Sequence, residues 1–347
     1  LKWKILGPPK FTQQATMKVL LQEDPGSRYV ELLREGLATL DGIQLTVAKD
    51  PQDLASHFVS ADIFIGWKIT PELAQKAERL QVLIVPGAGV QTIIEEARNL
   101  NKRLNVTVVN EHGNARFCAQ HVLGLLLTLT NKILPHHNWM KEGKWRTGDK
   151  EAASTPLQGL TIGLLGYGAI NRTVRTLLEP FGVRFAACKK RPFPTQIDSE
   201  LQTFSSEQKL EFFEACDVVI CGLPHTTSSE NLVGAAEFEA LGANGYFINV
   251  GRGPVVNEEA LYEALKNETI HSAAIDVWYD YRAEADSQNR IYPYQFPFQE
   301  LGNIVLSPHR AASPSEHPAR IVEIVENIRR HQAGLELMNI VNLEEGY

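Results

Sequence analysis

Cysteine and methionine are scarce in this sequence, whose 347 residues include 4 Cys and 3 Met. The cysteines (Cys118, Cys188, Cys216 and Cys221) are too sparse for a disulfide-stabilised secreted domain and form no closely spaced metal-binding pairs. Such cysteine usage is typical of a reducing compartment. We therefore expect a cytoplasmic protein without a metal site.

Long apolar runs and an excess of positive charge are also missing. No apolar run reaches the roughly 18–20 residues of a membrane-spanning helix, and residues 1–4 do not begin a signal-peptide pattern. The 34 Lys and Arg against 41 Asp and Glu give a net charge of −7, which offers no electrostatic basis for binding nucleic acid or an anionic membrane. We expect neither as a partner.

The composition itself is that of an ordinary globular protein, with 44% hydrophobic and 22% charged residues. These values exclude a disordered or low-complexity chain. A length of 347 residues exceeds one ordinary domain and falls short of three. We therefore expect two domains, each with its own core.

Two series of strand-like apolar runs alternate with helical stretches, a pattern typical of parallel α/β architecture. The first predicts one small doubly wound domain, and the spacing of the second matches a complete dinucleotide-binding sheet. The first series comprises residues 2–7, 43–49, 62–67, 81–87 and 106–111, and the second comprises residues 160–165, 183–188, 217–223, 245–250, 271–278 and 303–306.

Two helices are expected to link these domains. Residues 117–134 are apolar on almost every face, which predicts a helix buried between two bodies that leads into the second domain. Residues 315–333 predict a helix that packs back on the first domain. The first domain is therefore expected to be discontinuous, built from both ends of the chain.

A glycine-rich turn, Gly166-Tyr167-Gly168, follows the first strand of the second series and precedes a helix expected over 172–178. Its glycines let the backbone approach a pyrophosphate, whose charge the helix N-terminus would stabilise. The third glycine of the G-x-G-x-x-G pattern is Asn171 here, and a purely structural turn is the alternative. The surrounding β–α–β pattern favours a dinucleotide site.

Three cations, Lys189, Lys190 and Arg191, end the next strand, where an NAD site would carry an acidic residue for the ribose 2′-hydroxyl. A solvated run of charge at a strand end is the alternative interpretation. The position favours a site for the 2′-phosphate of NADP, with NAD as the alternative cofactor.

Arg252 and His309 each follow a strand of the second series, at the sheet edge where open α/β proteins bind ligands. Arg252 lies between two glycines, and its planar guanidinium suits a carboxylate. A surface arginine in a turn and an ordinary imidazole are the alternatives. Together the two residues predict an active site more strongly than either does alone.

Over nearly its whole length the sequence resembles the D-2-hydroxyacid dehydrogenase family, which includes the NAD-dependent formate dehydrogenases. Residues 133–145 and the Asp-Val-Trp triplet favour the formate dehydrogenase branch. The segments that carry the resemblance are Pro86–Val90, Asn114, His121, Gly166–Gly168, Leu223–Pro224, Asn249–Gly253, Asp276–Trp278, Ser307–His309 and Gly346–Tyr347.

This resemblance implies a flavodoxin-like substrate domain (1–117 plus 312–347), a Rossmann dinucleotide-binding domain (118–311) and an active site in the cleft between them. It also implies a homodimer. Arg252 would bind the substrate carboxylate, and His309 would be the general acid–base during hydride transfer.

Further site residues follow from the same resemblance. The backbone of Gly87, Ala88 and Gly89 would hold the substrate carboxylate, Asn114 would lie near the substrate, and Asp276 would bind the nicotinamide carboxamide. The expected cofactor-binding residues are Gly166, Tyr167, Gly168, Ala169, Ile170, Lys189, Lys190, Arg191, Leu223, Pro224, Val250, Gly251 and Asp276.

One position departs from the family pattern. The family places Glu, or Gln in formate dehydrogenases, five residues after the aspartate, as the partner of the histidine, and this sequence has Tyr281. A carboxylate would raise the pKa of the imidazole, whereas a phenol would orient the ring without charge. Asp280 or Glu284 could substitute if the loop is repacked.

The segment from Trp278 to Phe298 is longer than expected for the family and rich in aromatic residues and proline. It could pack on the surface as an Ω-loop or form a lid or pocket wall.

The sequence as a whole predicts interconversion of a 2-oxo acid and a D-2-hydroxy acid with NADP(H), in the direction of reduction. Oxidation of formate or another small anion is the first alternative. A nucleotide-sensing protein without enzymatic activity is the second, because fold alone does not fix function.

Overall fold

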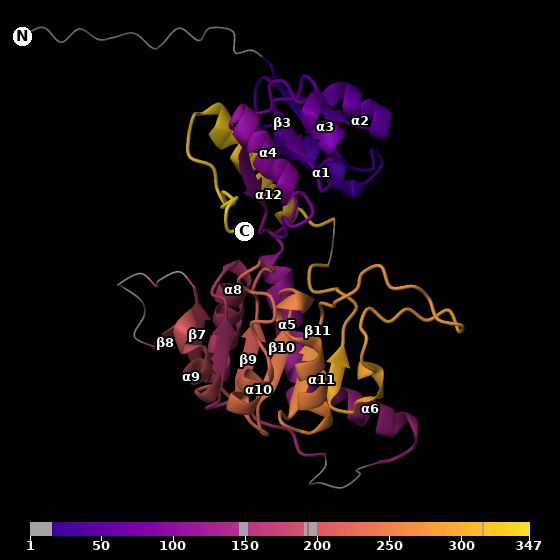
Figure 1. Ribbon diagram of the computed structural model, residues 1–347, viewed down its shortest axis with the longest axis vertical. Helices are drawn as coiled ribbons and strands as arrows, with labels where there is room; N and C mark the ends of the chain where they lie inside the picture. The colour runs from indigo at the N-terminus through magenta and orange to yellow at the C-terminus, as the bar shows by residue number, and fades with distance from the viewer. Residues whose placement is uncertain (1–15, 146–151, 191–192, 194–199, 314–315) are drawn as a thin grey trace, which may run out of the picture. The chain divides into compact units, whose positions relative to one another are not determined.

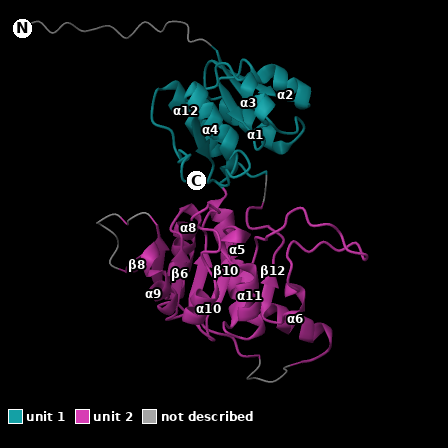
Figure 2. Cartoon of the chain, in the orientation of Figure 1, with its two compact units in different colours: residues 1–113, 315–347 teal, residues 114–314 magenta. Residues whose placement is uncertain are grey.

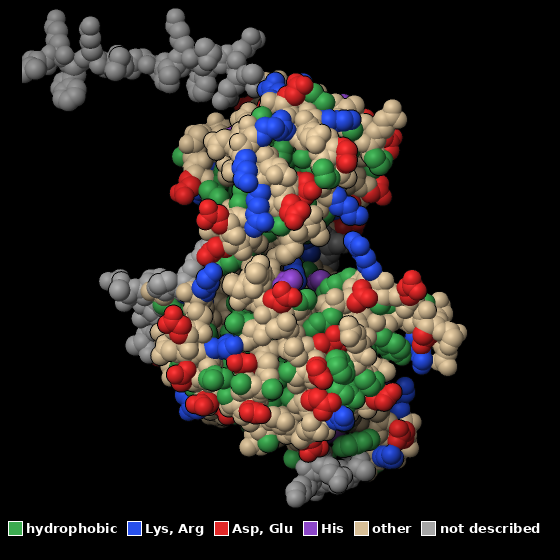
Figure 3. Space-filling model, in the orientation of Figure 1, with side chains coloured by type: hydrophobic (Ala, Val, Ile, Leu, Met, Phe, Trp, Pro, Cys, Tyr) green, Lys and Arg blue, Asp and Glu red, His purple; other side chains and the backbone are tan. Residues whose placement is uncertain are grey.

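The computed structural model describes residues 16–145, 152–190, 193, 200–313 and 316–347. The chain divides into two compact units, residues 1–113 with 315–347 and residues 114–314, which are coloured separately in Figure 2. Acidic and basic side chains are interspersed on the face shown in Figure 3.

The sequence predicts a substrate domain over 1–117 plus 312–347 and a dinucleotide-binding domain over 118–311. These domain roles stay predictions.

The first unit is a parallel five-stranded sheet, ordered β2-β1-β3-β4-β5, with helices on both faces. Helices α1 and α12, both labelled in Figure 1, cover one face. Ile324 and Ile328 of α12 pack there with Val30 and Leu33 of α1. The opposite face is covered by α2, α3 and α4. The elements are β1 Met17–Leu21, α1 Arg28–Leu37, β2 Ile43–Val47, α2 Pro51–Phe58, β3 Ile63–Ile65, α3 Pro71–Lys76, β4 Val82–Val85, α4 Ile94–Leu104, β5 Thr107–Asn110 and α12 Ala319–Gln332.

The first strand of this sheet differs from the sequence prediction. Strand β1 pairs with both β2 and β3 and fills the position that we expected residues 2–7 to occupy. Residues 2–7 lie outside the described residues. Strand β1 was not predicted because Lys18 interrupts its apolar residues and leaves a run of only Val19–Leu21.

The second unit is a parallel seven-stranded sheet, ordered β12-β11-β10-β9-β6-β7-β8. Helices α5 and α8 cover one face, and α9, α10 and α11 cover the other. The elements are α5 Ala115–Thr130, α6 Ile133–Lys141, β6 Thr161–Leu165, α8 Ala169–Leu178, β7 Arg184–Lys189, β8 Leu201–Ser205, α9 Lys209–Glu214, β9 Val218–Cys221, α10 Ala235–Leu241, β10 Tyr246–Asn249, α11 Glu258–Lys266, β11 Ser272–Ile275 and β12 Ile304–Leu306, with single 3₁₀ turns at Glu179–Phe181, Ser206–Gln208, Gly253–Val255 and Phe298–Glu300.

The two doubly wound α/β domains predicted from the sequence are confirmed, with one strand more than expected in the second. All six predicted strands are present, and β8 is additional. Only Leu201 and Phe204 of β8 are buried, and its other residues are exposed at the edge of the sheet. Its weak apolar pattern explains why it was not predicted.

The apolar stretch predicted as one helix over 117–134 is broken. Helix α5 ends at Thr130, Lys132 adopts a left-handed backbone conformation with φ 51°, and α6 begins at Ile133. Among the described residues no single helix is both long and apolar enough to cross a membrane. The pair α5 and α6 meets that criterion only together, and it bends by 60°.

Asn171 occupies the position of the third glycine in the nucleotide-binding pattern, and its side chain is buried against the strand ends. The Nδ2 amide donates to the carbonyl oxygens of Leu165 at 3.2 Å, Gly166 at 2.6 Å and Ile220 at 3.2 Å. Gly222 makes room for it, because a Cβ at position 222 would lie 3.1 Å from Nδ2. The asparagine therefore ties α8 to β6 and β9.

Replacing Asn171 by Gly would complete the G-x-G-x-x-G pattern, yet we expect it to destabilise the protein. The lost side-chain hydrogen bonds should lower the free energy of unfolding by about 1–3 kcal/mol, and glycine within a helix by about 1 kcal/mol more. Urea denaturation measures the loss. Arg172→Gly is the control, because Arg172 is exposed on the same helix. Equal losses in the two variants would contradict the contribution of the amide.

Candidate active site

The pairing register places six strand ends of the second unit at one edge of the sheet. Along the strand order β7-β6-β9-β10-β11-β12, one residue of each strand is paired with the corresponding residue of the next strand. These residues are, in that order, Cys188, Leu165, Cys221, Asn249, Ile275 and Leu306. The loops that follow these residues therefore all begin at the carboxyl edge of the sheet. Most of the predicted cofactor-binding and catalytic residues belong to these loops.

The glycine turn lies where the strand order reverses, between β6 and β9, which is the usual ligand position in doubly wound sheets. Gly166 has φ 81°, and a Cβ there would lie 2.8 Å from Leu223. Gly168 is exposed, and a Cβ there would meet no atom within 4 Å. Ala169 and Ile170 form the first turn of α8, whose amides point toward this open space. The turn can thus receive an anionic group.

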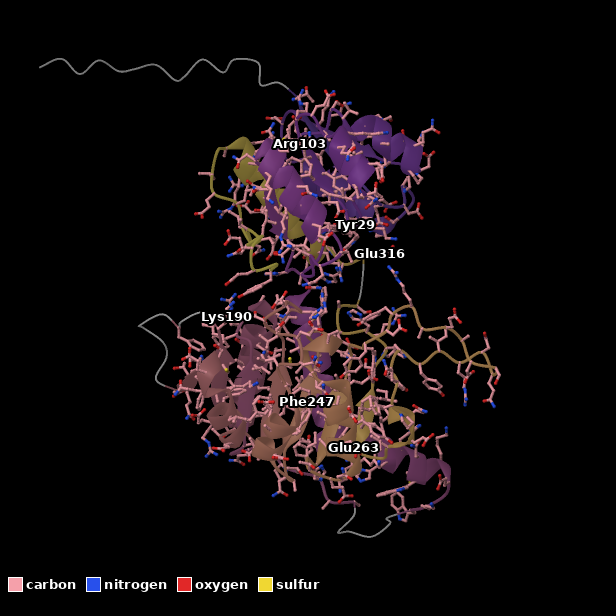
Figure 4. All side chains as sticks on the ribbon, viewed as in Figure 1. Tyr29, Arg103, Lys190, Phe247, Glu263 and Glu316 are labelled. Atoms are coloured by element: carbon pink, nitrogen blue, oxygen red, sulfur yellow. The ribbon has the colours of Figure 1, made fainter. Side chains whose placement is uncertain are left out.

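The basic residues at and beyond the end of β7 approach the same turn. The Lys189 ammonium lies 4.5 Å from the centroid of the Phe193 ring, and that ring lies 5.9 Å from the ring of Tyr167. Lys190 is exposed beyond the carboxyl end of β7, whereas Phe247 lies in the core of the same unit (Figure 4). Arg191 lies outside the described residues.

The loops after β9 and β10 touch through their backbones. A Cβ on Gly251 would lie 2.5 Å from the carbonyl oxygen of Leu223, the residue before Pro224, so only glycine fits this contact. Buried Asn249 accepts a hydrogen bond from Gly251 N and donates one to Arg252 O, which fixes the loop that contains Val250.

Arg252 itself is partly buried, and its Nη1 donates to Gly251 O at 2.7 Å. Burial lowers the pKa of Arg252. An arginine nevertheless keeps its positive charge at neutral pH. A cation held in a partly desolvated place can bind a carboxylate more strongly than one in bulk water.

Asp276, directly after β11, has no solvent-exposed surface and is surrounded by donors. Its carboxylate accepts from the Ser307 hydroxyl, from Arg310 N at 2.7 Å and from Ala311 N at 2.9 Å. Burial acts to raise the pKa of Asp276, but hydrogen bonds from His121, Ser307 and these two amides outweigh it and lower the pKa. The predicted role of Asp276 toward the nicotinamide carboxamide stays a prediction.

His309 and Tyr281 lie next to each other. Their ring centroids are 5.4 Å apart, and the Tyr281 hydroxyl accepts a hydrogen bond from Trp278 N at 3.2 Å. Arg252 acts electrostatically on both side chains. The second unit therefore brings together Arg252, Tyr281 and His309, whose catalytic roles stay predictions.

The electrostatic surroundings favour the uncharged forms of both rings. Desolvation lowers the pKa of His309; Arg252 and Arg310 lower it further, and Asp276 opposes them. Desolvation of the hydroxyl raises the pKa of Tyr281, so the phenol is neutral near pH 7.

The two acidic alternatives to Tyr281 make no contact with His309 in the described structure. Asp280 accepts from Arg282 N at 2.8 Å, and both Asp280 and Glu284 are exposed. A neutral phenol is thus the group beside the imidazole.

The aromatic segment packs mainly into the second unit. Phe298 and Trp278 are buried in its core, the Tyr294 ring lies 4.8 Å from Trp278, and Phe296 stacks on Tyr262 of α11. The residues between Tyr281 and Tyr292 form the long excursion after β11 in Figure 1. These contacts favour the packing interpretation over a pocket wall.

The remaining predicted substrate residues lie elsewhere. Gly87, Ala88 and Gly89 follow β4 in the first unit, where Asn110 Nδ2 donates to Ala88 O at 2.8 Å and the Trp67 indole covers Gly87. Asn114 begins α5 in the second unit. Among the described residues, no group of three or more His, Cys, Asp and Glu side chains could hold a metal ion.

His121 and Ser307 lie in the motifs that resemble the family, but the resemblance assigned no role to either residue. His121 of α5 has its Nε2 3.0 Å from Ser307 Oγ and 3.4 Å from Asp276 Oδ1. The only sequence signal for them was their place in the motifs, because their contact depends on three separate elements.

Similarity to known proteins identifies the family of the chain. Residues 123–311 match the family model described as "D-isomer specific 2-hydroxyacid dehydrogenase, NAD binding domain". The chain is 30% identical over 338 residues to a D-3-phosphoglycerate dehydrogenase of Archaeoglobus fulgidus, covering 94% of this chain and 59% of that protein. It is 26% identical over 263 residues to a formate dehydrogenase of Pseudomonas sp., covering 73% of this chain and 65% of that protein. The chain thus spans less than two thirds of either relative.

A solved structure shows the same fold. The NADPH-dependent glyoxylate/hydroxypyruvate reductase of Sinorhizobium meliloti, in complex with NADP and sulfate, has a TM-score of 0.77 and 21% identity, covering 95% of this chain and 100% of that one. At this identity the likeness concerns the fold alone. The family model, by contrast, extends over more than half of the chain. The chain therefore belongs to the D-isomer specific 2-hydroxyacid dehydrogenase family.

Proposed function

We propose that this protein reduces a 2-oxo acid to a D-2-hydroxy acid with NADPH, with NADH as the alternative cofactor. The observation that carries this proposal is the grouping of Arg252, Tyr281 and His309 at the carboxyl edge of one parallel sheet. A cation for a carboxylate and an imidazole for proton transfer are the groups that such a reaction needs. Membership of the family supports the same chemistry.

The substrate residues have separate tasks in this mechanism. Arg252 binds the carboxylate and polarises the 2-oxo group, and His309 donates a proton to the substrate oxygen. The backbone amides of residues 88 and 89 would hold the carboxylate, whereas Gly87 N, also predicted for this role, donates to Val85 O at 2.8 Å. Asn114 would lie near the substrate. When bound, the nicotinamide supplies the hydride.

The cofactor site fits a dinucleotide. Gly168 leaves open space at the start of α8 for a pyrophosphate, and Gly166 permits the tight turn before it. Lys189 and Lys190 supply charge for a 2′-phosphate. Arg191 has the same proposed role. The structure of the Sinorhizobium relative contains NADP, which supports this preference.

Domain roles and assembly are part of the proposal. The second domain would bind the cofactor and the first would contribute substrate contacts. A homodimer is proposed through α6, which buries none of its residues and exposes Ile133, Leu134 and Met140. A cytoplasmic location is also proposed from the cysteine usage.

A second candidate function is oxidation of formate, supported by the similarity to the Pseudomonas enzyme. Tyr281 stands where that branch has Gln, which argues against it. A panel of 2-oxo acids with NADPH, run beside formate with NADP⁺ and NAD⁺, decides between them. Turnover with formate alone would overturn the proposal, and binding of NADPH without any turnover would indicate a nucleotide-sensing protein.

His309→Asn should lower kcat for 2-oxo acid reduction by about 10²–10⁴-fold, because the amide cannot donate a transferable proton. Asparagine tolerates the left-handed backbone of this position, where φ is 56°. NADPH binding, followed by fluorescence, should be preserved. His57→Asn on α2 of the first unit, where the histidine is exposed, is the control. Near-normal turnover of His309→Asn would rule out the assigned role.

Tyr281→Glu should move the pH profile of reduction upward. Reduction needs the imidazolium of His309, and desolvation lowers its pKa, so the rate should fall as pH rises through that lowered value. A carboxylate beside the ring raises the pKa and extends activity to higher pH. Tyr281→Gln, which adds no charge, should leave the falling limb in place. The measurement is kcat/KM against pH for all three proteins; an unmoved limb in Tyr281→Glu would contradict the pairing.

Lys189→Asp should reverse cofactor preference. A charge-assisted hydrogen bond contributes about 1.5–3 kcal/mol, so the unmodified enzyme should favour NADPH by roughly one to two orders of magnitude in kcat/KM, less at high salt. An aspartate would instead accept from the 2′-hydroxyl and repel a phosphate. Lys189→Gln should only weaken the preference. An unmodified enzyme that favours NADH would show that the basic run is solvated charge.

A further inference from the structure

The backbone of the histidine loop needs support, because His309 has φ 56°, in the left-handed region that costs most residues roughly 1–2 kcal/mol. A left-handed residue followed by residues in a turn directs successive N–H groups to one side and forms a concave anion site. The amides of Arg310 and Ala311 follow His309 directly. Both donate to the carboxylate of Asp276, at 2.7 and 2.9 Å. Asp276 is thus the anion that holds the loop in this conformation.

Asp276 is in turn oriented by two side chains from other elements. Ser307, at the end of β12, donates its hydroxyl proton to Oδ1 of Asp276. Because that proton is used, Ser307 Oγ can only accept from His121 Nε2, which lies 3.0 Å away. The direction of the chain of hydrogen bonds is therefore His121 to Ser307 to Asp276, and His121 carries its proton on Nε2.

His121 and Asp276 belong to buried parts of the second unit, whereas Ser307 follows the less buried strand β12. His121 lies in α5 between the fully buried residues Ala119 and Val122, and Asp276 itself has no exposed surface. The Trp278 indole donates to Ser307 O at 2.9 Å and holds the strand end from the other side. A small displacement of Asp276 would release both amides and hence the backbone of His309.

We propose that His121, Ser307 and Asp276 form a positioning relay, which sets the place of the His309 imidazole through the backbone amides of residues 310 and 311. The effect of the relay on kcat rests on the proposed function, whereas its effect on the backbone of residues 310 and 311 does not. Positioning matters for rate because a misplacement of about 1 Å can cost about 10²-fold. None of the three side chains is required to touch the substrate.

The structural readout is hydrogen exchange of the amides of Arg310 and Ala311 in the full chain. Ser307→Ala removes the hydroxyl, and His121→Phe removes the donor to it. Both should accelerate exchange at these amides by about 10-fold or more, since protection depends on the local opening equilibrium. His121→Gln, whose amide nitrogen can replace Nε2–H, should restore most of the protection. Unchanged exchange in Ser307→Ala would overturn the relay whether or not the enzyme is active.

The kinetic readout is reduction of the best 2-oxo acid from the panel. Ser307→Ala and His121→Phe should lower kcat by about 10- to 100-fold, with the Kd for NADPH within about twofold of that of the unmodified enzyme, and His121→Gln should recover most of kcat. Loss of NADPH affinity with an unchanged kcat at saturating NADPH would overturn the relay, because these side chains would then act only on the cofactor that Asp276 is predicted to bind. If the unmodified protein reduces no 2-oxo acid, the proposed function fails while the exchange result still decides the relay.

Discussion

A buried carboxylate, that of Asp276, which must be surrounded by hydrogen-bond donors, is the constraint on which the catalytic edge depends. Removing a carboxylate from water costs several kcal/mol unless donors replace the lost hydration. Asp276 obtains these donors from one hydroxyl and two backbone amides of the chain segment 307–311. That segment must therefore fold around the aspartate, and the left-handed turn at His309 is the result. The need to satisfy one charge thus determines where the imidazole stands.

The parallel sheet brings the loops that contain Arg252 and His309 close together. Because six strand ends lie at one level, loops distant in sequence emerge next to each other without long connecting segments. Glycines then allow backbone contacts that a side chain would block, as at Gly251 against Leu223 O. Arg252 and His309 become neighbours through strand order, although 57 positions separate their numbers.

Much of this arrangement could be predicted from the sequence. Six of the strands of the second unit and the positions of Arg252, Tyr281 and His309 followed from apolar runs and motifs. Strand β8 could not be predicted, because only Leu201 and Phe204 face the core. The break at Lys132 was missed because both flanking segments are apolar. The contact of His121 with Ser307 depends on tertiary packing, which no local pattern encodes.

The scarcity of cysteine has a practical consequence for studying the protein in solution. All four thiols are buried, and desolvation raises the pKa of Cys188 to about 11 and that of Cys221 to about 12. Buried, protonated thiols react slowly with maleimide reagents. A cysteine introduced at an exposed position of each unit, such as Val322 and Leu210, would therefore take up a fluorophore selectively. Energy transfer between two such dyes would report the distance between the units with and without NADPH, without first removing any native cysteine.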